Sequence, residues 1–158
     1  KRDYRLPLLY WTIQKEDYSQ DFPLILTSGR IVEHEGGGDE TRSNMWLAEF
    51  APRMYVEINP EDASALGVAD GSEVWLATPE GARVRIAAWI TRRVAAGTVF
   101  MPFHFGGWFQ GEDLSGRYPP GTVPYVVGEA ANTAMTYGYD VVDSMQESKV
   151  TLCRIEAI

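Results

Sequence analysis

The sequence of 158 residues is poor in the side chains that usually hold metals or form covalent links. It contains one cysteine, Cys153, and two histidines, His34 and His104. A single cysteine cannot form a disulfide within the chain, which excludes the disulfide framework of many small secreted domains. The paired Cys and His spacings of zinc sites are also missing, so a zinc site is not predicted. No nucleophile stands beside a base in a pattern that would predict a catalytic triad.

Long hydrophobic runs and an excess of positive charge are missing as well. No apolar run approaches the roughly 20 residues of a membrane-spanning helix. Residues 1–14 lack an apolar segment followed by a small-residue cleavage site, so we expect no signal peptide there. The 14 Lys and Arg residues against 22 Asp and Glu give a net charge of −8. This balance argues against nucleic-acid binding, which needs clustered basic residues, but single arginines can still hold a nucleotide.

The length and the hydrophobic content of the chain suit one domain with a hydrophobic core. A domain of this length buries roughly two thirds of its unfolded surface, and 45% of the residues are hydrophobic. Residues 1–21 show no clear hydrophobic period and are predicted to form a linker or an extended arm. The domain is therefore expected to cover residues 22–158.

Short apolar or alternating stretches predict about six strands separated by turns. These strands are expected at 22–28, 54–58, 73–78, 83–90, 98–101 and 150–155. The first stretch is apolar almost throughout, so we predict that it is buried on both faces. Short, evenly spaced strands favour a small closed barrel over a doubly wound sheet.

Two short helices are predicted from the residues that start and stop them. Either Ser43 or Asn44 can cap a helix that follows at once, through its side-chain oxygen. A second helix is expected to begin after Asn59 and to end at Gly67, with Leu66 facing inward. Between residues 102 and 149, glycines and prolines recur so often that we predict no long element there. A long ordered loop of this kind is more often functional than accidental.

Three clusters in or beside the loops are candidates for ligand binding. The turn Ser28-Gly29-Arg30 after the first strand offers backbone amides and a guanidinium, which suit a phosphate or a polar heterocycle. The run of glycines at 36–38 permits close backbone approach, but it lacks the Lys-Ser/Thr pair of a phosphate loop. The aromatic segment 102–109 can stack on a flat ring. The alternatives are a plain turn with Arg30 paired to an acid, a solvated loop, and an apolar plug at the barrel end.

Taken in order, these clusters resemble the C-terminal molybdopterin-dinucleotide-binding domain of the molybdenum and tungsten oxidoreductases. Within that family the sequence is most similar to the formate dehydrogenase catalytic (alpha) subunit. The matching runs, within a resemblance over residues 20–158, are 23–30, 41–44, 58–63, 66–68, 70–71, 101–107, 129–132 and 145–149. The resemblance implies a mainly β fold with short helices, built as a six-stranded double-psi β-barrel like that of aspartate decarboxylase.

The resemblance also implies a cofactor and the residues that bind it. The cofactor would be bis-(molybdopterin guanine dinucleotide) with molybdenum or tungsten, gripped between two walls of the barrel. The first wall would consist of Thr27, Gly29 and Arg30, extended by His34, Thr41, Arg42 and Ser43. The second wall would consist of Phe103, His104, Gly106 and Trp108, with Asn132, Gln146 and Lys149 reaching the pterin or guanine end. This interpretation requires segments 28–30 and 103–107 to meet at one end of the barrel.

The family's metal-ligating Cys or selenocysteine and its iron–sulfur clusters belong to the rest of the enzyme and have no match here. Cys153 is instead expected to be a small buried side chain in the last strand. We therefore expect a cofactor-clamping domain of a formate dehydrogenase, catalytically incomplete alone. Its expected partners are the upstream domains of the same subunit and the electron-transfer subunits.

Two alternatives to this function stay open at this stage. One is a double-psi barrel that recognises proteins without redox chemistry, and the other is a self-contained hydrolase or decarboxylase. The sequence does not distinguish molybdenum from tungsten, one electron acceptor from another, or a cytoplasmic from a periplasmic location.

Overall fold

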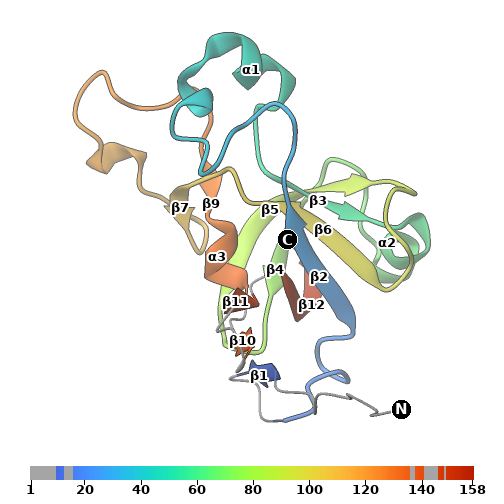
Figure 1. The fold of residues 1–158 in the computed structure, drawn as a ribbon. Helices are drawn as coiled ribbons and strands as arrows, with labels where there is room; N and C mark the ends of the chain where they lie inside the picture. Colours follow the sequence, from blue (N-terminus) through green and yellow to red (C-terminus); the bar gives the residue numbers. More distant parts are fainter. Residues whose placement is uncertain (1–9, 13–15, 136–137, 141–145, 148) are drawn as a thin grey trace, which may run out of the picture.

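The computed structural model describes residues 10–12, 16–135, 138–140, 146–147 and 149–158. Its centre is a closed barrel of six strands in the order β12-β2-β6-β3-β5-β4 (Figure 1). The barrel strands are β2 (Leu24–Gly29), β3 (Tyr55–Ile58), β4 (Glu73–Ala77), β5 (Arg83–Ile90), β6 (Thr98–Pro102) and β12 (Val150–Ala157). All six lie where strands were predicted. The mainly β fold with a six-stranded double-psi barrel is confirmed.

The pairing of the barrel strands brings distant parts of the sequence to one end. β2 runs parallel to β6, and β3 runs parallel to β5, while the other neighbours are antiparallel. In the β2–β6 register Gly29 lies opposite Pro102, so the two strands end side by side. In the β12–β2 register Val150 lies opposite Thr27, which brings the start of β12 to the same place.

The core fills the barrel with side chains that alternate along its strands. Leu26, Val56, Leu76 and Val99 have no exposed surface. Cys153 is also fully buried, and burial raises the pKa of its thiol to about 12, so it acts as a small apolar side chain as predicted.

The prediction that the first strand is buried on both faces is wrong. Leu24 and Leu26 face the core, but Ile25 between them is 43% exposed. In a barrel wall one face of a strand points inward and the other can remain uncovered, and an apolar run does not reveal which.

The two predicted helices are present with the expected caps. Helix α1 (Met45–Phe50) begins after Asn44, whose side chain accepts hydrogen bonds from the backbone N–H groups of its first turn. Helix α2 (Pro60–Leu66) begins after Asn59 and ends at Gly67, which has a φ of 68°. The expected inward position of Leu66 is wrong, because this short helix buries only Ala63 and Leu66 is 37% exposed.

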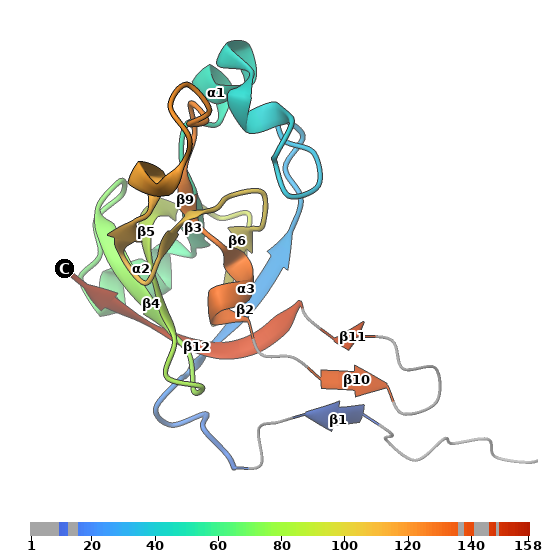
Figure 2. The same ribbon diagram turned by 90° about the vertical axis from the view of Figure 1, so that its left-hand side faces the viewer.

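The remaining elements are short and lie outside the barrel. They are η1 (Thr41–Ser43), η2 (Ser115–Arg117), α3 (Ala131–Ala134), the sheet of β7 (Gly107–Phe109), β8 (Glu112–Asp113) and β9 (Gly128–Glu129), and the sheet of β1 (Tyr10–Thr12), β10 (Gly138–Asp140) and β11 (Gln146–Glu147). Figure 2 shows α1 at one end of the barrel and the β1–β10–β11 sheet toward the other. Within the described ranges every helix is too short for a bilayer span.

Candidate functional site

The ends of β2 and β6 form a corner in which two of the predicted clusters meet. The backbone N–H of Phe103 donates to the carbonyl of Gly29 over 3.2 Å. The hydroxyls of Thr27 and Ser28 donate to backbone carbonyls of β6, over 3.2 and 2.9 Å. Segments 28–30 and 103–107 therefore share one end of the barrel, as the cofactor-binding interpretation requires. The two hydroxyls are used to hold the strand pair together.

His104 joins the two sides of this corner from inside. The side chain is fully buried, its Nε2 accepts a hydrogen bond from the backbone N–H of Ile31 at 2.9 Å, and its Nδ1 lies 2.8 Å from the carbonyl oxygen of Gly36. Because the backbone N–H can only donate, Nε2 carries no proton and Nδ1–H donates to Gly36. Burial lowers the pKa of His104 and favours this neutral form. His104 thus positions the loop against the β6 end, with both ring nitrogens in use.

The other histidine, His34, is also a structural link. It is buried, and its Nε2 lies 3.1 Å from the carbonyl oxygen of Ala51, so Nε2–H is the donor. Its Nδ1 then accepts from the Thr41 hydroxyl at 3.2 Å, and that hydroxyl accepts from the backbone N–H of Glu35. A hydroxyl beside a histidine resembles a nucleophile and its base, but here both groups are used to tie the loop to the residue after α1.

Arg42 bridges the glycine loop and the aromatic segment. Its Nε donates to the carbonyl of Gly38, and its Nη1 donates to the carbonyl of Gly106, each over 3.1 Å. Gly38 has a φ of 78°, and a Cβ built there would lie 2.1 Å from the carbonyl oxygen of His104. Only glycine fits at this crossing, so the loop and the β6 end pack backbone against backbone.

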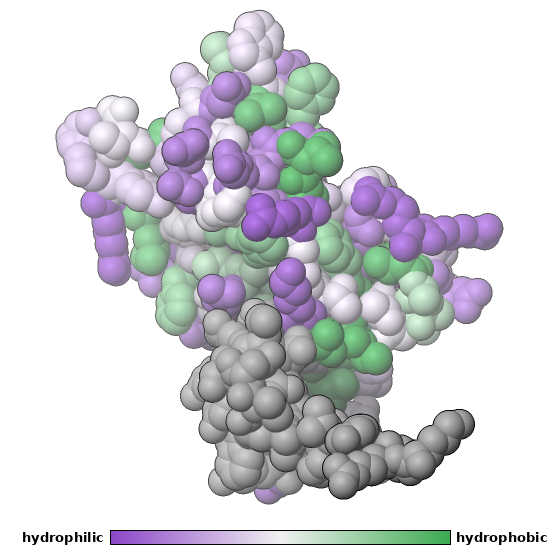
Figure 3. All heavy atoms as spheres, in the orientation of Figure 1, coloured by the Kyte–Doolittle hydropathy of each residue, from purple (hydrophilic) through white to green (hydrophobic). Residues whose placement is uncertain are grey.

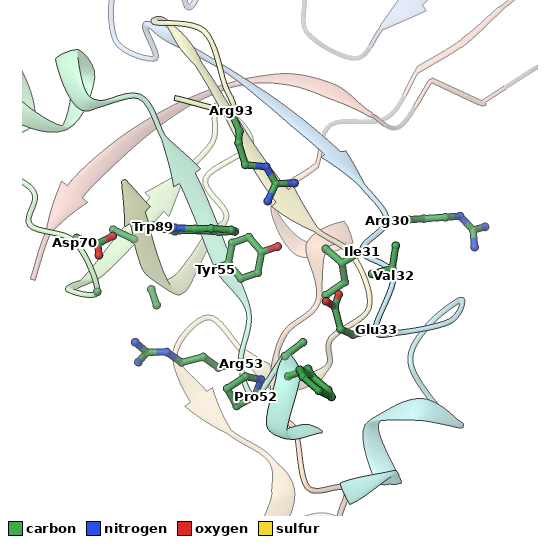
Figure 4. Close-up of a pocket in the computed structure, with 15 residues that line it drawn as sticks. Arg30, Ile31, Val32, Glu33, Pro52, Arg53, Tyr55, Asp70, Trp89 and Arg93 are labelled. Carbon is green, nitrogen blue, oxygen red and sulfur yellow. The ribbon is translucent and has the colours of Figure 1, made fainter. Parts of the chain in front are cut away.

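Three basic residues surround the corner. Arg30 is exposed, and its guanidinium lies 5.5 Å from the centre of the Phe103 ring. Figure 4 shows its side chain extending outward from the end of β2. Within the described part of the chain Arg30 forms no ion pair, which disfavours the alternative that it is paired to an acid. Arg42 lies across the corner, and the backbone carbonyl of Lys149 accepts a hydrogen bond from Ser28.

Three other predicted site residues, Trp108, Asn132 and Ser43, lie outside this corner, and a fourth cannot be placed from the described residues. Trp108 is on β7, where its buried Nε1 has no hydrogen-bond partner among the described residues. Asn132 is exposed on α3, a helix that packs on β5, and Ser43 is exposed in η1. Gln146 belongs to β11, but its side chain lies outside the described parts of the structure. The structure therefore gathers the two walls, while it leaves Trp108, Asn132 and Ser43 away from the corner's hydrogen bonds.

Glu129 is an anchor that the residue pattern did not single out. The side chain is fully buried, and its carboxylate accepts hydrogen bonds from the backbone N–H groups of Arg85 (3.1 Å), Gly111 (2.5 Å) and Gln110 (3.0 Å). These contacts fasten the β7–β8 turn, where Gln110 has a φ of 49°, to the barrel. An isolated glutamate in a glycine-rich stretch gives no signal of burial. Its only signal was its place in the motif 129–132.

A groove of about 530 Å³ lies beside the corner, between residues 30–33 and the outer faces of β3 and β5 (Figure 4). Its floor includes Tyr55 and Trp89, whose rings pack edge to face with centres 5.0 Å apart. Arg93 lies 5.2 Å from the Trp89 ring and forms an ion pair with buried Glu57, 3.3 Å away. Burial raises the pKa of Glu57. The sequence did not predict this groove, because its walls come from four separated segments.

Comparison with known proteins agrees with this geometry. Residues 24–152 match the family described as the molydopterin dinucleotide binding domain. The chain belongs to this family. Membership supports dinucleotide binding over the protein-recognition alternative.

Known members and a solved structure are similar to the chain. An alpha subunit of a formate dehydrogenase from Methanococcus maripaludis is 31% identical over 139 residues, which are 88% of this chain and 17% of that protein. A formate dehydrogenase alpha subunit from Methanocaldococcus jannaschii is 41% identical over 86 residues, 54% of this chain and 13% of that protein. Acetylene hydratase from Pelobacter acetylenicus has a TM-score of 0.68 over 90% of this chain and 19% of its own, at 17% identity, which shows the shared fold alone. The chain spans less than a fifth of the length of these relatives.

Proposed function

We propose that this chain is the cofactor-clamping domain of a molybdenum- or tungsten-dependent formate dehydrogenase. In this proposal the corner between β2 and β6 grips molybdopterin guanine dinucleotide for a catalytic subunit that interconverts formate and carbon dioxide. The observation that carries the proposal is the double link made by His104 and Arg42, which holds two glycine-bearing walls at one end of the barrel.

The chemistry of the corner fits such a ligand. The dinucleotide has an anionic pyrophosphate and flat rings with many hydrogen-bonding edges. Arg42 uses two of its five N–H groups on backbone carbonyls, which leaves others for an anion, and Arg30 is exposed beside the Phe103 ring. A Cβ at Gly29 would lie 2.9 Å from the Phe100 ring and one at Gly106 3.3 Å from Arg42 Nη1, so both glycines allow the walls of the corner to pack closely. Because the chain has a net charge of −8, direct contacts at these arginines have to outweigh long-range repulsion.

Eight of the predicted residues then have a proposed role. Arg30 and Arg42 would bind phosphate, Gly29, Gly106 and Phe103 would line the pterin, and His34, Thr41 and His104 would fix the walls. Thr27, Ser43, Trp108, Asn132, Gln146 and Lys149 complete the proposed set. When bound, the metal–pterin group supplies the redox chemistry, while this chain binds and orients it. Iron–sulfur clusters and electron-transfer subunits would belong to the rest of the enzyme.

The experiment is to purify the complete catalytic subunit and to measure its pterin and its acid-released guanine nucleotide. Arg30→Ala and Arg42→Ala should each lower cofactor content about tenfold or more, because each removes charge-assisted hydrogen bonds worth about 1.5–3 kcal/mol. Arg92→Ala is the matched control, since Arg92 is exposed in the turn before β6, at the opposite end of that strand. Unchanged cofactor content in both corner variants would refute the proposed site. A subunit that binds the cofactor but does not oxidise formate would refute the proposal that formate is the substrate.

A further inference from the structure

We propose that Glu129 is a positioning residue for Arg42, which would bind phosphate in the proposed site. Glu129 would act through strand β9 and the carbonyl of Gly106, against which the Arg42 guanidinium is held. This inference rests on the proposed function, because the ligand concerned is the dinucleotide that the corner would grip. It adds a residue that shapes the site without touching that ligand.

The first observation is that two donors meet at the carbonyl of Gly106. Nη1 of Arg42 donates to this oxygen over 3.1 Å, and the backbone N–H of Gly128 donates to it over 3.0 Å. Gly128 is the first residue of β9, and Glu129 is the second. The guanidinium also lies close to the backbone here, since a Cβ at Gly106 would be 3.3 Å from Nη1. A shift of β9 would therefore displace the oxygen that orients Arg42.

The second observation is that the Glu129 carboxylate fixes the place of β9. It accepts hydrogen bonds from the backbone N–H of Arg85 on β5 and from those of Gln110 and Gly111 in the turn between β7 and β8. In the parallel pairing of β7 with β9, Glu129 lies opposite Trp108. One side chain thus joins β9 to the barrel and to the turn, while the backbone of β9 joins the corner at Gly106.

The third observation is the free-energy cost of this arrangement. The Glu129 carboxylate is fully buried, and no ion pair reaches it within the described ranges, since the Arg85 side chain is paired with Glu73. Its donor Gln110 has a φ of 49° and is the only described residue other than glycine with a positive φ. A buried charge without a counter-ion and a non-glycine residue in the left-handed region both cost free energy. Costs of this kind collect at functional sites, which supports a role for Glu129 beyond holding a turn.

Two other roles for Glu129 are distinguishable from positioning. Direct contact with the ligand is disfavoured, because both carboxylate oxygens accept from backbone N–H groups. The surface that Figure 3 shows over α1 and the sheet of β7, β8 and β9 mixes hydrophilic and hydrophobic side chains, whereas Glu129 within that sheet is fully buried. A role in stability alone makes a different prediction, namely that a variant loses cofactor only in proportion to its loss of stability.

The test measures how fast pterin leaves the complete, cofactor-loaded catalytic subunit after dilution. Glu129→Gln should raise the release rate about fivefold, the effect of weakening one hydrogen bond of Arg42. Leu76→Ala is the matched control, because Leu76 is buried on β4, which pairs with neither β2 nor β6. It should lower the melting temperature at least as much and change the release rate less than about twofold. Equal release rates from both variants would overturn the inference.

Gly128→Ala disturbs the same strand and leaves the carboxylate in place. A Cβ at Gly128 would lie 3.2 Å from the Cβ of Met54, so β9 has to move away from Met54. This variant should raise the release rate about threefold. An unchanged rate would overturn the inference even where Glu129→Gln does not yield a folded subunit.

A double-mutant cycle tests whether Glu129 acts through Arg42. Arg42→Lys keeps the positive charge but lacks the guanidinium fork that donates to the carbonyls of Gly38 and Gly106. In this background Glu129→Gln should change the release rate less than about twofold, because the contact that it disturbs is already gone. The same rise in both backgrounds would show that Glu129 does not act through Arg42 and would overturn the inference.

The same measurements separate this inference from the proposed function. Fast release from Arg42→Lys together with unchanged release from Glu129→Gln would refute the positioning role alone. Unchanged release from both Arg42→Lys and Arg30→Ala would refute the proposed site.

Discussion

The backbone N–H of Ile31 donates a hydrogen bond to Nε2 of His104 across 2.9 Å, between the loop after β2 and the end of β6. The other ring nitrogen of His104 donates to Gly36, so one buried imidazole ties together two segments about seventy positions apart. The geometry of the candidate site depends on this neutral ring.

His104→Ala should lower the free energy of unfolding by about 2–4 kcal/mol, because it removes two buried hydrogen bonds and leaves a cavity. Chemical denaturation measures this change. Phe109→Ala, at an exposed position on β7, should cost less than about 1 kcal/mol. Similar losses for both variants would contradict the role given to His104.

The pH dependence of stability follows from the same residue. The unfolded chain takes up a proton on His104 near the ordinary pKa of 6.5, whereas burial lowers the pKa in the folded chain. The contribution of His104 to the free energy of unfolding is therefore fully present above pH 6.5, and it falls as the pH drops below that value. Nitrogen NMR should show the proton on Nδ1 at pH 7, and a proton on Nε2 would contradict the proposed tautomer.

Gly38→Ala should destabilise the chain far more than Gly37→Ala. A Cβ at residue 38 would lie 2.1 Å from the carbonyl oxygen of His104 at a positive φ, whereas a Cβ at residue 37 meets only Asp39 Oδ1 at 3.5 Å. We expect a loss above about 2 kcal/mol at residue 38 and below about 1 kcal/mol at residue 37. Thermal unfolding of the two variants compares them directly, and equal melting temperatures would disprove the close crossing.

Glu57→Gln tests the buried carboxylate beneath the groove. Burial raises the pKa of Glu57 above its usual 4.5 in the folded chain, so between 4.5 and that raised value the unfolded chain releases a proton that the folded chain keeps. The free energy of unfolding should therefore fall as the pH rises through this interval. In the variant it should depend less on pH. At pH 7 its stability should stay within about 1 kcal/mol of the parent, because Arg93 is largely exposed. Glu49→Gln, at an exposed position on α1, should leave the profile unchanged.

Glu129→Gln should loosen the turn between β7 and β8. The amide can offer one oxygen where the carboxylate accepts three backbone N–H groups, so we expect a loss of about 2–4 kcal/mol. Hydrogen exchange at the amides of Gln110 and Gly111 should accelerate, and exchange in β12 should change less. Glu112→Gln, an exposed neighbour, is the control, and equal effects on exchange would count against the anchor.

Most of the fold could be predicted from the sequence, because local residue patterns determine where its strands and helices lie. Alternation placed the six barrel strands, and Asn44, Asn59 and Gly67 placed the helix ends through their capping chemistry. The exposed sides of Ile25 and Leu66 were missed because apolar patterning does not tell which face a short element buries.

The site was predictable only in part for a related reason. The meeting of Gly29 with Phe103 followed from the order of motifs in the family, not from any local signal. The roles of His104 and Arg42 as links between backbone segments depend on contacts across more than sixty residues. The groove and the contacts of Glu129 also depend on residues that are far apart in the sequence. They could therefore be identified only from the structure.

The most direct test of the central claim is a structure of the complete catalytic subunit with its cofactor bound. We predict the pyrophosphate within about 3 Å of the Arg30 and Arg42 guanidinium groups, and the pterin against Gly29 and Gly106. A dinucleotide bound elsewhere, with the β2–β6 corner facing solvent or another polypeptide, would contradict it.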